Sequence, residues 1–223
     1  MMLTLRHPVD LLLFLEFCLG FGSGGSARLV DGQLSFGEFG ASPRPADGLF
    51  FAVLPEAAAA ADISRLGQHQ SRTHGLTGKP ILAERLHVSV HKIGDYAGRP
   101  RGIVAAGCEA GAAVEMSSFD LAFDRVVSFG GRSGNRPFVL RGGDGVAGLL
   151  ALHRHLGAAL QKVGLWRWVK PQYEPHVTLL YDDRYVAEQA VDPVRWTVRE
   201  FVLVHSLHGQ GRYDFLGRWK LRD

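Results

Sequence analysis

The sequence has few of the features that mark common functional classes. Its two cysteines, Cys18 and Cys108, lie in apolar or Ala- and Gly-rich surroundings, so neither a disulfide framework nor a zinc cluster is predicted. The formal net charge is only +3, which is too small for the strongly basic surface of a duplex-binding protein but tolerates a phosphate-bearing substrate. There is no G-x-S-x-G elbow, Walker loop or HExxH helix. We therefore expect neither a bound metal nor a cofactor.

Long hydrophobic runs are also missing. In residues 1–29 Arg6, an apolar stretch and a small-residue tail outline a signal peptide, but Asp10 and Glu16 interrupt the stretch and it is too short to span a bilayer. Three interpretations stay open for this N-terminal extension: an export signal, a disordered extension, or a segment upstream of the true start. We expect a cytoplasmic, monomeric protein with no membrane partner. Residues 30–48, rich in Gly, Pro and Ser, are predicted to be a linker.

Residues 49–223 are predicted to form one folded domain. Apolar periodicity and turn residues predict the order strand, helix, strand, helix, strand, strand, helix, strand, strand, strand. These elements cover residues 49–55, 56–75, 86–92, 101–115, 117–129, 137–142, 145–164, 175–183, 196–207 and 211–221. The order predicts an α+β fold of two duplicated halves, each of which contributes one strand to a shared cleft.

Two of these strands carry the same polar pattern. In LHVSVHKIG (86–94) His87 is followed by Ser89, and in PHVTLLYDD (175–183) His176 is followed by Thr178. Residues i and i+2 of a strand face the same side, so each histidine and its hydroxyl point together. A polar stripe on a buried strand is costly unless it is hydrogen-bonded or lines a cleft.

The bare pattern is weak, because His69-Gln70-Ser71 matches it in a polar helical segment. Each motif alone fits an ordinary histidine near a strand end. The apolar setting and the matching places in the two halves favour a functional pair instead. Two imidazoles and two hydroxyls across a cleft suit attack on phosphorus. With ordinary pKa values of about 6.5, one imidazole can take a proton from water while the other donates one to the leaving oxygen. The hydroxyls can donate to the non-bridging oxygens, so no metal is needed.

These motifs resemble those of the 2H phosphoesterases, in particular the bacterial RNA 2′,3′-cyclic phosphodiesterases historically called 2′-5′ RNA ligases. The similarity covers residues 49–223 and includes LFFAVLP, ERLHVSVHKIG, GLLALHRHLGAAL, YEPHVTLLYD and HGQGRYDFLGRWKL. The resemblance implies a bilobal α+β fold with two antiparallel sheets around a central cleft and helices outside. It also implies metal-independent opening of 2′,3′-cyclic phosphates, on RNA ends or small nucleotides, to 2′-phosphates. Some members also join or split 2′-5′ linkages.

The resemblance further implies roles for individual residues. His87 and His176 would be the acid–base pair, and the family tendency makes His176 the base and His87 the acid. Ser89 and Thr178 would bind the phosphate. This sequence departs from the family mildly at Ser89, where threonine is common and the hydroxyl is kept. It also departs at two positions that the resemblance implies bind substrate, Lys92 and Tyr181. Many members have a base-stacking aromatic at the first of these and an arginine near the phosphate at the second.

Other side chains near the motifs allow two interpretations each. His91, two residues after Ser89, is expected on the motif face, either at the rim of the cleft as a third candidate substrate-binding residue beside Lys92 and Tyr181, or as plain surface. His153 and His155 are expected on the surface of a helix. Trp166, Trp168 and Tyr173 would form a stacking platform or cap a core. The alternative function for the whole domain is a module that binds a nucleotide or an RNA end in the same cleft without turnover.

Overall fold

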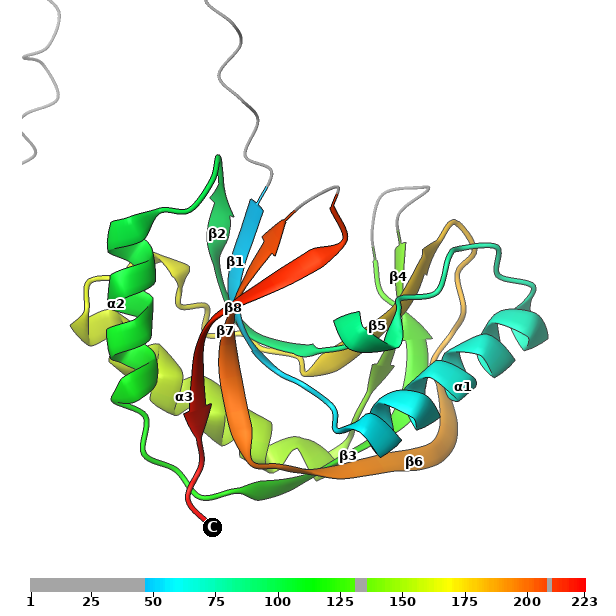
Figure 1. Ribbon diagram of the computed structural model, residues 1–223. Coiled ribbons are helices and arrows are strands. Elements are labelled where there is room, and N and C mark those ends of the chain that lie inside the picture. Colours follow the sequence, from blue (N-terminus) through cyan, green and yellow to red (C-terminus); the bar gives the residue numbers. More distant parts are fainter. Residues whose placement is uncertain (1–46, 131–135, 208–209) are drawn as a thin grey trace, which may run out of the picture. The chain divides into compact units, whose positions relative to one another are not determined.

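The computed structural model describes residues 47–130, 136–207 and 210–223. The strands in these ranges are β1 (Asp47–Val53), β2 (Val88–Tyr96), β3 (Phe119–Ser128), β4 (Arg136–Arg141), β5 (His176–Asp182), β6 (Gln189–Val198), β7 (Glu200–Leu207) and β8 (Arg212–Lys220). The α-helices are α1 (Ala57–His74), α2 (Arg101–Ala112) and α3 (Ala147–Lys162), and short 3₁₀ helices include η1 (Ala83–Arg85) and η3 (Trp166–Trp168). The predicted N-terminal extension, 1–29, lies outside the described residues. So does the predicted linker up to residue 46, whereas its last two residues begin β1 (Figure 1).

The helices form where the sequence predicts them. Helix α1 has an Ala-rich start and ends at Gly75, which adopts a left-handed φ of 61° and donates its backbone N–H to Arg72. Helix α3 places its leucines at helical spacing, and all of them except Leu150 are buried. None of the helices in the described ranges is long and apolar enough to cross a membrane.

The strand prediction fails at one place near the C-terminus. A single strand was expected over 196–207, but the structure has two, β6 and β7, which are interrupted at Arg199 and lie in different parts of the sheet. Strand β6 begins earlier than expected and includes Pro193, which lacks a backbone N–H. It tolerates this proline because it is an edge strand that pairs only with β3.

All eight strands join in one antiparallel sheet in the order β6-β3-β4-β5-β2-β1-β7-β8. The predicted α+β class and antiparallel pairing are confirmed. The expected two sheets are instead two four-stranded halves, β6-β3-β4-β5 and β2-β1-β7-β8, joined where β2 meets β5. A single residue pair, Val88 with Val177, makes this junction. Both valines are fully buried, so core side chains fill the space around the junction between the two halves.

The two faces of the sheet differ in what covers them. Helix α1 packs near β5 and β6, α2 packs near β7 and β8, and α3 packs near β2 and β3 (Figure 1). Buried side chains of all three helices join one face of the sheet in the main core, for example Ile63, Ala110 and Leu152. The alternate residues of β1 and β7 face the other way and form a small separate cluster, Phe50, Ala52, Val202 and Val204. The side chains of both sequence motifs lie on this second face.

Candidate active site

The two motif strands meet at the centre of their motifs. Val88 of β2 pairs with Val177 of β5 in antiparallel register, so His87 faces Thr178 and Ser89 faces His176. All four flanking side chains therefore project from the same face. Residues diagonally related across such a pair lie about 7 to 8 Å apart, which leaves room between the two imidazoles for a group the size of a phosphate. The structure thus brings together the four residues that the sequence singles out.

Both imidazoles are held in the same way. The Nδ1 of His87 lies 2.8 Å from the carbonyl oxygen of Arg85, and the Nδ1 of His176 lies 2.7 Å from that of Glu174. Because a carbonyl can only accept, Nδ1 carries a proton in each ring and donates it. The neutral ring then has its lone pair on Nε2, on the far side from the anchoring carbonyl. Each Nε2 can accept a proton when the ring is neutral and donate one when the ring is charged.

A β-bulge follows each motif at the same place. Along β2 the partners on β1 pass from Ser89 to His91, so Val90 is an extra residue. Along β5 the partners on β4 pass from Thr178 to Leu180, so Leu179 is an extra residue. Each extra residue is the third after its histidine. A bulge reverses the alternation of side chains beyond it, because two residues of one strand oppose one of the other.

The bulge overturns the rim interpretation of His91: its side chain lies on the opposite face of the sheet from the motif side chains and is buried. Its Nε2 lies 2.8 Å from the carbonyl oxygen of His153 on α3, and its ring stacks on the ring of His153 at 4.0 Å between centroids. His153 in turn stacks on Tyr173 at 4.3 Å. His153 is therefore buried rather than on the surface as expected, whereas His155 is exposed. Burial lowers the pKa of His91, and it lowers that of His153 to about 4, with the neighbouring His91 and Arg154 acting in the same direction.

The same reversal brings Lys92 and Tyr181 to the motif face. Lys92 is the cross-strand partner of Phe50, whose ring packs against His87. Its ammonium group forms an exposed ion pair with Asp95 at 2.6 Å. Tyr181 occupies the equivalent place on β5, and its side chain is 45% exposed. These two candidate substrate-binding residues therefore lie where a substrate held between the motifs can meet them.

Aromatic side chains surround His87. Its ring centroid lies 4.9 Å from that of Phe50 and 5.7 Å from that of Tyr213, whose ring stands edge-on. The Tyr213 hydroxyl is 3.4 Å from Nδ1 of His87, and the guanidinium carbon of Arg85 lies over the Tyr213 ring at 5.0 Å. Burial lowers the pKa of His87. The anchoring carbonyl opposes this, and the charges of His176 and Arg85 add to the lowering.

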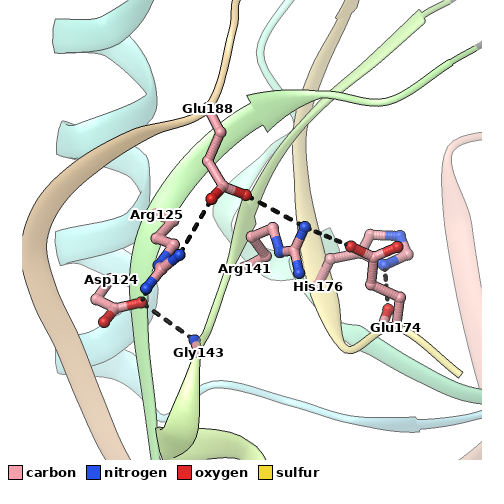
Figure 2. Close-up of polar contacts among 7 residues, drawn as sticks. All are labelled: Asp124, Arg125, Arg141, Gly143, Glu174, His176 and Glu188. Carbon is pink, nitrogen blue, oxygen red and sulfur yellow. Dashed lines mark hydrogen bonds and ion pairs between the residues drawn. The ribbon is translucent and has the colours of Figure 1, made fainter.

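Charged side chains surround His176 instead. Arg141, its cross-strand partner on β4, places Nη1 2.7 Å from Glu174 and 3.2 Å from Glu188. Glu188 also pairs with Arg125 at 3.1 Å, and Arg125 lies 3.7 Å from Asp124. Figure 2 shows this chain of ion pairs running along the sheet and ending beside the imidazole. The ring of Phe129 stands edge-on to His176 at 5.0 Å.

Several residues at the site were missed by reasoning from the sequence. Arg85 and Glu174 each precede a motif histidine by two residues, and this shared spacing was a usable signal. Tyr213 lies within HGQGRYDFLGRWKL, but nothing in that segment shows which way its side chain points. Of the proposed stacking platform, Trp168 and Tyr173 pack against the core, and only Trp166 is largely exposed, at 66%.

Comparisons with known proteins agree with this geometry. The model of the 2′-5′ RNA ligase superfamily matches residues 54–210. A solved structure described as a phosphoesterase is 27% identical, with a TM-score of 0.60, and the alignment covers 79% of this chain and 99% of that one. Escherichia coli LigT complexed with ATP is 26% identical, with a TM-score of 0.59, over 80% of this chain and 99% of its own.

Two further findings complete the comparison. LigT has also been solved with NADP⁺ and with 3′-AMP. The protein TT0787 of Thermus thermophilus is 22% identical over 78% of this chain and 98% of its own, with a TM-score of 0.59, which shows likeness of fold alone. No curated protein matches the chain.

Proposed function

The chain belongs to the 2′-5′ RNA ligase superfamily of 2H phosphoesterases, and from this premise we propose that it opens 2′,3′-cyclic phosphates to 2′-phosphates. The substrates would be RNA ends or small nucleotides. One observation carries the proposal: His87 and His176 project from adjacent antiparallel strands, each anchored through Nδ1 and each with a hydroxyl two residues on. This arrangement leaves two Nε2 atoms free for proton transfer around one phosphate.

The reaction needs one proton removed and one supplied. A neutral imidazole takes a proton from water through Nε2 as the water oxygen bonds to phosphorus. The bond from phosphorus to the 3′ oxygen breaks, and the second imidazole, protonated beforehand, gives its Nε2 proton to that oxygen. Ser89 and Thr178 donate hydrogen bonds to the non-bridging oxygens as negative charge builds on them. Exchange with solvent resets both rings. Run in the same direction with an RNA 5′-hydroxyl group in place of water as the attacking group, the same two imidazoles would form a 2′-5′ linkage and release the 3′ oxygen as a hydroxyl.

The side chains around the motifs suit a substrate with a nucleobase. Tyr181 offers an exposed ring on the motif face, and base–aromatic stacking stabilises binding by about 1 to 3 kcal/mol. Lys92 on the opposite strand offers a cation, although its pairing with Asp95 lowers the charge available to a phosphate. His91 is excluded from this set because it is buried behind the sheet.

A second candidate function is binding without turnover. It is favoured by the LigT structures, which hold ATP and NADP⁺, ligands without a 2′,3′-cyclic phosphate. A nucleotide-binding module would use the same face and the same hydroxyls. It would show affinity for cyclic nucleotides but no product, and substitution of one histidine would weaken binding only modestly.

The experiment is incubation of the purified protein with a short RNA that ends in a 2′,3′-cyclic phosphate, in the presence of EDTA. We expect a 2′-phosphate product from the wild type, and a loss of about 10² to 10⁴ in rate for His87→Ala and for His176→Ala. His155→Ala is the matched control, because His155 is exposed on α3 away from the motifs, and it should keep full activity. Full turnover in either motif variant, or loss of activity with EDTA, would contradict the proposal. Binding without product would favour the module.

A further inference from the structure

The half of the sheet formed by β2, β1, β7 and β8 carries an aromatic surface on the motif face. Starting from Lys92, the cross-strand partners are Phe50 on β1, Val204 on β7 and Phe215 on β8. Directly opposite residues of neighbouring strands share a face, so Phe215 lies on the motif face about three strand spacings, or about 14 Å, from β2. In the described residues no helix side chain packs on the buried cluster beneath this surface. Phe215 itself is 46% exposed, so the surface is open to a ligand.

We propose that this surface binds the nucleotide that precedes the cyclic phosphate in an RNA chain, with its phosphodiester group on Arg85 and its base on Phe215. We call Arg85, Tyr213 and Phe215 the outer subsite. Because the cyclic phosphate ends the chain, the rest of the RNA must leave the motifs over one half of the sheet. The inference rests on the proposed function and narrows its substrate from RNA ends or small nucleotides to RNA ends of two or more nucleotides.

Tyr213 connects the first motif to the rest of the outer subsite. Its ring stands edge-on to that of His87 at 5.7 Å between centroids, and its hydroxyl is 3.4 Å from Nδ1. Tyr213 and Phe215 pair with Ser206 and Val204, which lie two residues apart on β7. Both aromatic side chains therefore leave the same face, about 7 Å apart along β8. The outer subsite begins beside the first motif and extends away from it along this strand.

Arg85 supplies a cation without a carboxylate partner. Its guanidinium carbon lies over the Tyr213 ring, 5.0 Å from the centroid, which places the group on the motif face. Among the described residues no carboxylate forms an ion pair with it, and its Nε is buried without a hydrogen-bond partner. A guanidinium group held by its face keeps the N–H donors at its edge for a phosphodiester oxygen. Three other cations of this face are each paired with a carboxylate: Lys92 with Asp95, Arg141 with Glu174 and Arg218 with Glu200.

Phe215 supplies a ring for a base. The guanidinium carbon of Arg218 lies 5.3 Å from its centroid, and nearly half of the side chain is exposed all the same. Single-stranded nucleic acids are bound in this way, by exposed rings that stack with bases beside cations that attract the backbone. Stacking of one base on one ring raises the affinity by roughly 5- to 150-fold. A hydrophobic partner protein would require a continuous exposed apolar patch instead, whereas the apolar residues beside Phe215 on this face, Val202 and Val204, are buried.

The other half of the sheet is less suited to the RNA backbone. On its motif face Arg125 and Arg141 pair with Asp124, Glu174 and Glu188 (Figure 2). Two guanidinium groups and three carboxylates leave a formal charge of −1 beside the second motif, and a negative charge repels a phosphodiester group. The charges therefore favour an RNA chain that leaves the cyclic phosphate over the half that contains the outer subsite.

The first test compares two substrates on each variant. One is 2′,3′-cyclic AMP, and the other is a dinucleotide that ends in the same cyclic phosphate. We expect the wild type to have a kcat/KM about tenfold or more higher for the dinucleotide, since only this substrate reaches the outer subsite. Arg85→Gln and Phe215→Ala should each lower this ratio about threefold or more, and the double variant should bring it to about one. Any effect of a variant on the chemical step is common to both substrates and cancels in the ratio.

The controls remove the same kinds of side chain elsewhere. Arg125→Gln takes an arginine from the motif face of the other half, and Tyr185→Ala takes an exposed ring from the segment between β5 and β6. Both should leave the ratio of the two kcat/KM values unchanged. The inference is overturned by a wild-type ratio of about one, by a ratio that neither Arg85→Gln nor Phe215→Ala lowers, or by one that Arg125→Gln abolishes.

The second test measures binding without turnover. The ligand is a short fluorescent RNA that ends in a 2′-phosphate, which is the proposed product, and its affinity is followed by anisotropy at several salt concentrations. For single strands, each neutralised phosphate contributes about −0.7 to the slope of log affinity against log salt concentration. Arg85→Gln should therefore make this slope less negative by about 0.7, whereas Arg65→Gln, at an exposed arginine of α1, should leave it unchanged.

The same titration distinguishes stacking from charge. Phe215→Ala should lower the affinity about fivefold or more at every salt concentration and leave the slope unchanged, because stacking releases no counterions. An unchanged slope in Arg85→Gln, or no binding of the RNA by the wild type, would refute the outer subsite. If the wild type opens neither cyclic substrate, the proposed function fails, and the anisotropy titration still decides whether the outer subsite binds RNA.

Discussion

The two motif strands share their backbone geometry but differ in their surroundings. Each has a histidine anchored to the carbonyl two residues earlier, a hydroxyl two residues later and an extra residue one place beyond that. Around His87, however, the neighbours are the rings of Phe50 and Tyr213, whereas a network of ion pairs lies beside His176.

This difference indicates that the motif residues and the residues around them have separate roles. The repeated geometry makes the two Nε2 atoms equivalent, so by itself it cannot say which of them would be the acid in the proposed reaction. The residues that break the equivalence come from elsewhere in the chain, from β1, β3, β4, β8 and the segments before each motif. An internal duplication, which stays a prediction here, would account for the repeated motif geometry. Later divergence would account for the different surroundings.

The contrast between the apolar surroundings of His87 and the ionic surroundings of His176 should have its largest effect on the free energy of unfolding. Phe50 is 9% exposed and packs against His87 and Tyr213, so Phe50→Ala should lower the free energy of unfolding by about 3 kcal/mol. Arg141→Gln removes two half-exposed ion pairs and should cost about 1 kcal/mol or less. Urea denaturation at neutral pH measures both.

A matched control comes from the same sheet. Phe215 of β8 is 46% exposed, and Phe215→Ala should change stability by no more than about 0.5 kcal/mol. Equal losses in the free energy of unfolding for Phe50→Ala and Arg141→Gln would contradict this prediction. They would show that the apolar surroundings of His87 and the ionic surroundings of His176 stabilise the two halves equally.

The second prediction concerns the hydroxyls, which the geometry makes equivalent. Ser89→Ala and Thr178→Val each remove one hydrogen bond to a charged phosphate oxygen, worth about 1.5 to 3 kcal/mol, or roughly 10- to 100-fold in rate. Because the bond strengthens as charge builds on phosphorus, the loss should appear in kcat. Ser89→Thr and Thr178→Ser, which keep a hydroxyl, should retain most activity. Loss in only one half would mean that the phosphate does not lie centrally between the strands.

Much of this arrangement is legible in the sequence, for identifiable reasons. Helix α3 is visible because its leucines recur at helical spacing, and α1 because an Ala-rich start and Gly75 bound it. The motif pairs are visible because a histidine and a hydroxyl are conspicuous in apolar strands. Strand β6 was misplaced because an Asp-Pro pair suggests a loop, and only its position at the sheet edge makes a strand possible there.

Two features of the site could not be predicted from the sequence. The bulges at Val90 and Leu179 insert one apolar residue among others, so the alternation along HVSVHKI gives no sign that the face changes before His91. The contact of Tyr213 with His87 depends on β8 returning to the sheet through β7 and β1, a pairing that spans more than a hundred residues of chain. Local pattern carries no information about either.

A column of three stacked rings, His91, His153 and Tyr173, connects the two halves on the face of the sheet that the helices cover. His91 follows the first motif, Tyr173 precedes the second, and His153 of α3 lies stacked between them. Burial lowers the pKa of His153 to about 4, so the folded protein keeps this ring neutral where the unfolded chain, with an ordinary value of 6.5, would take up a proton. The lowered pKa of His91 acts in the same direction.

The smallest predicted effect is the change in stability with pH that this column of rings causes. Between pH 6.5 and about 4 the unfolded state binds more protons than the folded state, so stability should fall as the pH is lowered through this window and level off for His153 below it. His153→Phe keeps a stacked ring and the backbone carbonyl that His91 contacts, but it cannot titrate. The decline of the urea midpoint from pH 6.5 to 4 should therefore be shallower in His153→Phe than in the wild type. Equal slopes would mean that the column of rings does not resist protonation in this pH range.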